Sequence, residues 1–129
     1  MSARPIAGIA LGAALFSAAA GRLPRPRRPT EHDAALLVAA ACSAGVEELV
    51  WRGVVPRLLQ RADKRLTVAI TSLGFVLAHR RHADGRAMAT LGVLAVTLGS
   101  VAARRDGLAT TVIAHATYDV LVLLDRVST

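Results

Sequence analysis

Cysteine and aromatic residues are scarce in this sequence, and both shortages exclude classes of protein. Cys42 is the only cysteine among 129 residues, so an internal disulfide framework and a zinc site built from several cysteines are excluded. Two Phe, one Trp and one Tyr are the only aromatic residues. A net charge of +7 can indicate a nucleic-acid-binding face, but such faces usually interleave aromatic and basic side chains within a recognisable motif. The sequence has neither feature, and we expect no nucleic-acid partner.

An uncharged apolar run of about 18 residues, the usual mark of a transmembrane helix, is also missing. The composition is nevertheless too apolar for a typical soluble domain, with 53% hydrophobic residues, 19% charged residues and a mean hydropathy of +0.46. Basic residues other than Arg52 lie at the ends of apolar runs or in the gaps between them, as they do in membrane proteins. We therefore expect a multi-pass protein of the cell membrane, in contact with lipid, whose helices pack through small side chains.

Five apolar runs follow one another, and together they predict an all-α membrane helical bundle of about five transmembrane helices. The runs are residues 5–21, 34–56, 66–78, 87–103 and 107–124. The first run is either a retained span or a signal peptide, because Ala18–Ala20 resembles a cleavage site; the hydrophobic segments that follow favour a retained span. Gly8 and Gly12 offer a small-residue packing face on it. The predicted division is 1–33, the first helix with a Pro/Arg-rich loop, and 34–125, the helical core.

Charged residues inside the second run are the first candidates for function. Each charge at the centre of a membrane helix costs about 2.5–3.5 kcal/mol, so Glu47, Glu48 and Arg52 must face protein or water. Glu48 and Arg52 are four residues apart with the acid first, which predicts an ion pair along one helix face. Glu47 points about 140° away from Arg52 and is expected to have no partner in its own helix. Pro56 is expected to end or kink this helix, because it has no N–H to donate.

Two later runs place histidines at helical spacing. Phe75 and His79 share a helix face, so the ring is expected to shield the imidazole from lipid. His115 and Asp119 also share a face, so the carboxylate can orient the imidazole or join it on a metal ion. Counted from the side of the second and fourth connections at ~1.5 Å per residue, Glu47, His79 and His115 lie roughly 15, 20 and 12 Å deep. Side chains from three helices are therefore predicted to face one water-filled pocket, a functional-site hypothesis.

These residues form three motifs that resemble those of a known family. Glu47-Glu48-x-x-x-Arg52, Phe75-x-x-x-His79 and His115-x-x-x-Asp119 resemble the EExxxR, FxxxH and HxxxN/D motifs of the CPBP family (CAAX proteases and bacteriocin-processing enzymes, also called Abi). The resemblance covers about residues 34–125, and the motifs match in order and spacing. It implies an all-helical intramembrane endopeptidase, a hydrolase that cuts a peptide bond in a membrane-associated peptide or protein.

The resemblance also implies roles for the motif residues. Glu47 is implied to be the general base that activates water, with His79 holding that water, while Glu48 and Arg52 form a structural pair. His115 and residue 119 are implied to stabilise the oxyanion or to bind a metal. Members are described both as metalloproteases and as glutamate-type proteases without metal.

Position 119 departs from the prenyl-protein endopeptidases of the family, which carry Asn there. An ionised Asp119 would repel an oxyanion, and it is better suited to orient His115 or to bind a divalent ion. Glu47, His79, His115 and Asp119 are accordingly the predicted ligands of a divalent metal such as zinc, if one is bound, with water in an open position. A site without metal stays open as the alternative.

Two other functions explain some of the same residues. A non-enzymatic immunity or partner-binding protein of the same fold is the main alternative, and an ion or proton pathway would also use carboxylates and histidines inside the membrane. The chain is short for the family, so an accessory helix supplied by a second copy, in a homo-oligomer, is a further alternative. His32 and His82 are assigned no role, because both are expected in polar loops.

Overall fold

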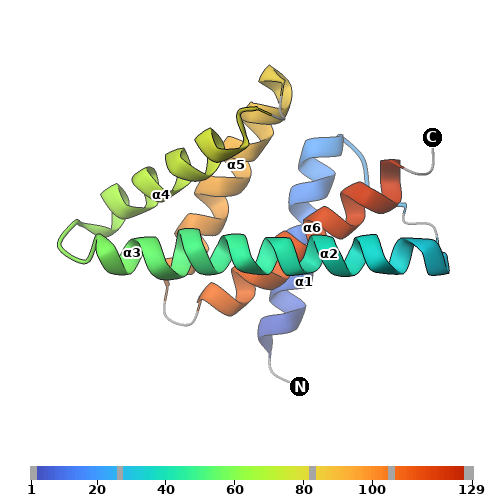
Figure 1. Cartoon of the computed structure of the whole chain (residues 1–129), viewed down its shortest axis with the longest axis horizontal. Helices are drawn as coiled ribbons and strands as arrows, with labels where there is room; N and C mark the ends of the chain where they lie inside the picture. Colours follow the sequence, from blue (N-terminus) through green and yellow to red (C-terminus); the bar gives the residue numbers. More distant parts are fainter. Residues whose placement is uncertain (1–2, 26–27, 82–83, 105–106, 127–129) are drawn as a thin grey trace.

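The computed structural model of the protein describes residues 3–25, 28–81, 84–104 and 107–126, and these residues form helices and connections without a strand (Figure 1). This confirms the predicted all-α fold, since each of the five apolar runs falls in one continuous helical segment, which we call a rod. The elements are α1 (Ala3–Ala20), α2 (Glu31–Glu48), η1 (Leu49–Val54), α3 (Val55–Leu58), α4 (Lys64–His79), α5 (Gly85–Ala102) and α6 (Gly107–Arg126).

Aspartates fix where three of the helices begin. Asp63 and Asp84 precede α4 and α5, and each accepts a hydrogen bond of 2.8 Å from a backbone N–H in the first turn, that of Leu66 and Ala87 respectively. At the start of α2, Asp33 accepts 2.7 Å bonds from the backbone N–H and the hydroxyl of Thr30. Such caps satisfy N–H groups that have no partner within the helix. The polar connections therefore set the limits of the apolar rods.

The second rod runs straight through the proline that was expected to end or kink it. Figure 1 shows α2, η1 and α3 as one long helix, and the predicted end at Pro56 is wrong because the helix continues to Leu58. The reason lies in the turn before it, where Leu49–Val54 is a π-helix and the Val55 N–H donates to the Val50 carbonyl five residues earlier. This wider turn carries the backbone past a residue that cannot donate. It also places the widened turn directly after Glu48.

Four rods are long and apolar enough to cross a membrane in the described part of the chain. They are Ala3–Ala20, Asp33–Leu58, Gly85–Ala102 and Gly107–Asp125. The fifth predicted span, α4, has 16 residues and is not among them. Large apolar side chains such as Ile9, Val38 and Val93 are more than half exposed, as expected for helices that face lipid.

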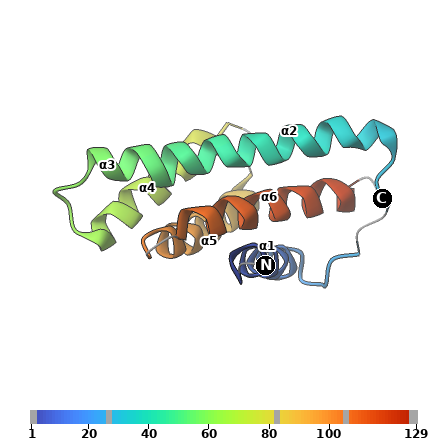
Figure 2. The ribbon, with the colours of Figure 1, turned by 90° about the horizontal axis from the view of Figure 1, so that it is seen from below.

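Helix α6 is the centre of the bundle. In Figure 2 it lies between the α2–α3 rod and α1, and it packs against α1, α2 and α5, while α5 also packs against α4. Gly8 and Gly12 of α1 allow the closest approach, as predicted: a Cβ on Gly8 would lie 2.7 Å from the Ile113 Cβ, and one on Gly12 would overlap the Ala114 carbonyl. The division of the chain at residue 33 stays a prediction, and α1 packs directly on the second part.

Candidate active site

Glu48 lies at the buried centre of the three motifs. Its side chain is fully buried, and Oε2 lies 3.8 Å from the Arg52 Nε, so the predicted ion pair is present. Its other oxygen, Oε1, accepts a hydrogen bond of 3.0 Å from the His115 Nδ1. One carboxylate therefore connects the first motif on the α2–η1 rod to the third motif on α6.

Arg52 is held by two further helices. Its Nη2 donates to the Ala95 carbonyl of α5 at 3.0 Å, and the Ser72 hydroxyl of α4 donates to the same carbonyl at 3.1 Å. The Arg52 Cζ also lies 5.3 Å from the centre of the Phe75 ring, within cation–π range. A buried charge is tolerated only when it is paired and hydrogen-bonded. Glu48, Arg52 and His115, which we call the buried set, thus join four rods of the bundle.

Glu47 faces His79 across the gap between α2 and α4. The Glu47 Oε2 lies 3.5 Å from the His79 Nε2, and both side chains are about one third exposed. The other ring nitrogen, Nδ1, lies 2.8 Å from the Phe75 carbonyl oxygen, which can only accept. Nδ1 must therefore carry a proton, and in the neutral ring Nε2 presents its lone pair toward Glu47.

Glu47 does have a partner in its own helix, contrary to the prediction. The Ser43 hydroxyl lies one turn earlier and donates to the Glu47 Oε1 at 3.0 Å. Ser43 carries no charge, so helical spacing between charged residues does not reveal it as a partner of Glu47. This bond occupies one carboxylate oxygen and leaves Oε2 directed at His79.

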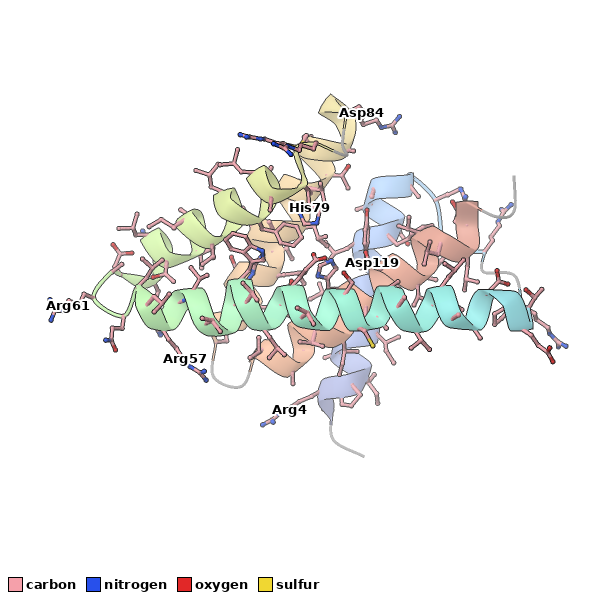
Figure 3. The ribbon with its side chains drawn as sticks, in the orientation of Figure 1. Arg4, Arg57, Arg61, His79, Asp84 and Asp119 are labelled. Carbon is pink, nitrogen blue, oxygen red and sulfur yellow. The ribbon has the colours of Figure 1, made fainter. Side chains whose placement is uncertain are left out.

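Asp119 lies too far from His115 for the hydrogen bond by which it was predicted to orient the imidazole. Its Oδ2 lies 3.7 Å from the His115 Nε2, within ion-pair range but beyond an ordinary hydrogen bond. Glu48 makes the hydrogen bond to this imidazole instead. Asp119 is about one third exposed and, with His79, lines a cleft of about 490 Å³. Figure 3 shows the two residues on the same side of the α2–α3 rod, between α4 and α6.

Phe75 packs inside the protein rather than as a shield against lipid. It is 1% exposed, and its ring centre lies 4.5 Å from that of His79 and 5.6 Å from that of His115. The predicted contact with His79 is present, and the same ring also contacts the His115 imidazole. Its position sets the spacing between the second and third motifs.

The six ionisable motif residues thus divide into two groups by exposure. The residues of the buried set are at most 7% exposed. Glu47, His79 and Asp119, which we call the open set, are each about one third exposed. Two contacts of the buried set were not predicted from the sequence. Glu48 and His115 are 67 positions apart, and the partner of Arg52 on α5 is a backbone oxygen, that of Ala95. Neither contact leaves a pattern in a short stretch of sequence. His82 lies outside the described residues, and so does the side chain of His32.

The four predicted metal ligands do not surround a single point. Across residues 3–25, 28–81, 84–104 and 107–126, no group of three or more His, Cys, Asp or Glu side chains is placed to hold a metal ion. The four side chains are arranged in two separate pairs: the Glu47 Oε2 lies 3.5 Å from the His79 Nε2, and the Asp119 Oδ2 lies 3.7 Å from the His115 Nε2. The arrangement therefore does not fit a shared metal, and the metal set stays a prediction.

Comparison with known proteins assigns the chain to a family. The family model for type II CAAX prenyl endopeptidase Rce1-like proteins matches residues 31–121, which include all three motifs. Comparisons with curated proteins and with solved structures each give no significant match. The family match confirms the resemblance seen in the motifs, and the apolar helices agree with it. The chain therefore belongs to the type II CAAX prenyl endopeptidase Rce1-like family, and it is a multi-pass membrane protease.

Proposed function

We propose that this protein is an intramembrane endopeptidase in which Glu47 acts as the general base. The observation that carries the proposal is the 3.5 Å approach of the Glu47 Oε2 to the His79 Nε2, with both side chains about one third exposed and His79 itself lining the cleft. A water molecule held between them donates one hydrogen to each acceptor. Its oxygen lone pair is then directed at the carbonyl carbon of a peptide in the cleft.

The proton balance follows from that placement. Glu47 takes a proton as the water oxygen bonds to the carbonyl carbon, which forms a tetrahedral oxyanion. Glu47 then delivers this proton to the leaving nitrogen as the C–N bond breaks. The products are a carboxylic acid and an amine, which exchange a proton to become a carboxylate and an ammonium group, and no redox partner is needed.

Within the buried set, Glu48 and Arg52 would act through position rather than through contact with substrate. Glu48 ties Arg52 to His115, and this connection fixes the turn on which Glu47 sits. The Nε2 of His115 points toward Asp119 at the cleft, where, when protonated, it would donate to the oxyanion. Asp119 would then orient that edge of the ring. No step in this scheme passes through a metal.

The substrate is proposed to be a peptide segment that reaches the cleft from the membrane. The test is cleavage of a pool of short synthetic peptides by the purified full chain in detergent, read by mass spectrometry. Glu47→Gln should abolish cleavage, because the amide cannot take the proton. Glu31→Gln is the matched control, since Glu31 is exposed at the start of the same rod, and it should cleave as the wild type does.

Two outcomes would contradict the proposal. Equal cleavage by wild type and Glu47→Gln would remove the assigned base. Absence of cleavage by the wild type, together with a partner-binding phenotype that survives Glu47→Gln, would favour the non-enzymatic alternative.

A further inference from the structure

A second cavity continues from the cleft into the space between α1 and α5. It has a volume of about 300 Å³, and its lining residues are Leu15, Ala18, Ala19, Ala89, Thr90, Val93, Leu94 and Tyr118. Three of these residues, Ala19, Thr90 and Tyr118, also line the cleft that holds His79 and Asp119. The two spaces are therefore neighbours that share one wall.

The cavity exists because α1 and α5 each pack on α6 but, in the described residues, do not pack closely on one another. Gly8 and Gly12 hold the first half of α1 tightly against α6, and the Arg22–Asp125 ion pair ties the segment after α1 to the end of α6. Between these two attachments, alanines face α5 and leave the space unfilled. The wall formed by α1 is thus fixed at both ends.

The lining of the cavity is apolar. Thr90 turns its hydroxyl back to its own helix, where it donates to the Arg86 carbonyl at 3.1 Å. Apart from Thr90 and Tyr118, the residues that line the cavity are Ala, Leu and Val. An apolar side chain placed here would contact apolar walls without stranding a polar group, which favours its binding over that of a polar side chain.

We infer that this cavity, the α1–α5 pocket, receives a large apolar side chain of the peptide substrate at a position next to the bond that is cut, and that Ala19 sets the size it accepts. The inference rests on the proposed function, because the adjoining cleft must hold the reacting peptide bond. Ala19 is the controlling residue since it lines both spaces and has the smallest side chain of the three that do. Helix α1 begins and ends before residue 31, outside the family match.

The first test compares sequence preference among three proteins. Wild type, Ala19→Phe and Ala10→Phe are each given the randomised peptide pool, and the residues beside each cut are counted. Ala10 is the matched control because it is exposed and lies on the opposite face of α1, nine residues or about two and a half turns away. We expect wild type and Ala10→Phe to prefer Leu, Met or Phe at one position. Ala19→Phe should shift that preference to Ala or Gly, with kcat/KM for the large residues lowered roughly tenfold or more.

The second test measures binding without catalysis. Cys42 is the only cysteine, so Cys42→Ser supplies a background in which Ala19→Cys or Ala10→Cys is the single thiol, and Glu47→Gln keeps the peptide intact. A peptide with Leu at the selected position should slow maleimide labelling at position 19 and leave labelling at position 10 unchanged. The same peptide with Gly at that position should protect less.

The outcomes separate this inference from the proposed function. Unchanged preference in an active Ala19→Phe variant, or equal labelling of position 19 with and without the Leu peptide, overturns the pocket assignment and leaves Glu47 as the base. If Ala19→Phe is inactive toward every peptide, the labelling experiment alone decides. Full activity of Glu47→Gln would instead overturn the proposed function on which the pocket assignment rests.

Discussion

The His115 Nδ1 donates a 3.0 Å hydrogen bond to the Glu48 Oε1, and both side chains are buried. This contact joins the first and third motifs across two helices. It makes Glu48 the shared partner of a guanidinium and an imidazole rather than one half of an isolated ion pair. Glu47 and Glu48 are adjacent in the sequence but have different surroundings, because Glu47 is about one third exposed beside His79 and Glu48 is fully buried.

Loss of the Glu48 carboxylate should destabilise the fold. Glu48→Ala leaves the Arg52 guanidinium buried without its counter-charge and the His115 Nδ1 without its acceptor. Removing one member of a buried pair costs about 3–5 kcal/mol, which thermal unfolding of the purified protein in detergent would show as a lower Tm. Glu47→Ala is the matched control, because that side chain is partly exposed, and its Tm should stay close to that of the wild type. Equal losses from both variants would contradict the division into a buried and an open set.

Removal of the His79 imidazole should affect catalysis more than stability. His79→Ala deletes the acceptor that is proposed to hold the water beside Glu47, and loss of such a group typically lowers the rate by about 10²–10⁴-fold. Single-turnover cleavage of a selected peptide measures the chemical step. The Tm should change little, because the ring is about one third exposed. A rate within a few-fold of wild type would remove His79 from the proposed mechanism.

Chelation of divalent metal should leave peptide cleavage unchanged. The described side chains do not gather three ligands around one point, and the proposed proton transfers need only Glu47 and His79. The experiment is cleavage after dialysis against EDTA, with metal content measured by mass spectrometry before and after. Loss of activity that returns on addition of zinc would contradict this expectation and support the predicted set of Glu47, His79, His115 and Asp119.

Two helix glycines should respond in opposite ways to the same substitution. Gly12→Ala places a methyl group against the Ala114 carbonyl and 2.7 Å from the Thr117 Cβ, so α1 must move away from α6 and the Tm should fall. Gly92→Ala meets no atom within 4 Å. It should raise stability by about 0.5–1 kcal/mol, because Ala is the better helix former. A higher Tm for Gly12→Ala would show that α1 does not pack on α6 through this residue.

The sequence predicted the helices well because their limits depend on local chemistry. Apolar runs broken by Asp63 and Asp84, whose side chains cap the next helix, mark the rods without knowledge of their neighbours. Pro56 was misjudged for a related reason. The expectation that a proline ends or kinks a helix assumes α-helical hydrogen bonds between residues four apart. In the π-helix of Leu49–Val54 the hydrogen bonds join residues five apart.

Helical spacing also placed the motif pairs correctly within each rod. Glu48 meets Arg52, and Phe75 contacts His79, since residues four apart share a face in any α-helix. Spacing cannot tell which face of one rod meets which face of another. The metal set was predicted from residue type, depth along the helices and the family resemblance, and none of these fixes how side chains on different helices are directed toward one another.

The sequence by itself determined that the chain is a helical membrane protein carrying the three motifs of its family, because hydropathy and helical periodicity are properties of short stretches. Only the tertiary structure decided that His115 bonds to Glu48, that Glu47 faces His79, and that α1 leaves a pocket against α5. These relationships join residues on separate helices. They depend on how large and small side chains fit between the rods, which no single stretch of sequence specifies.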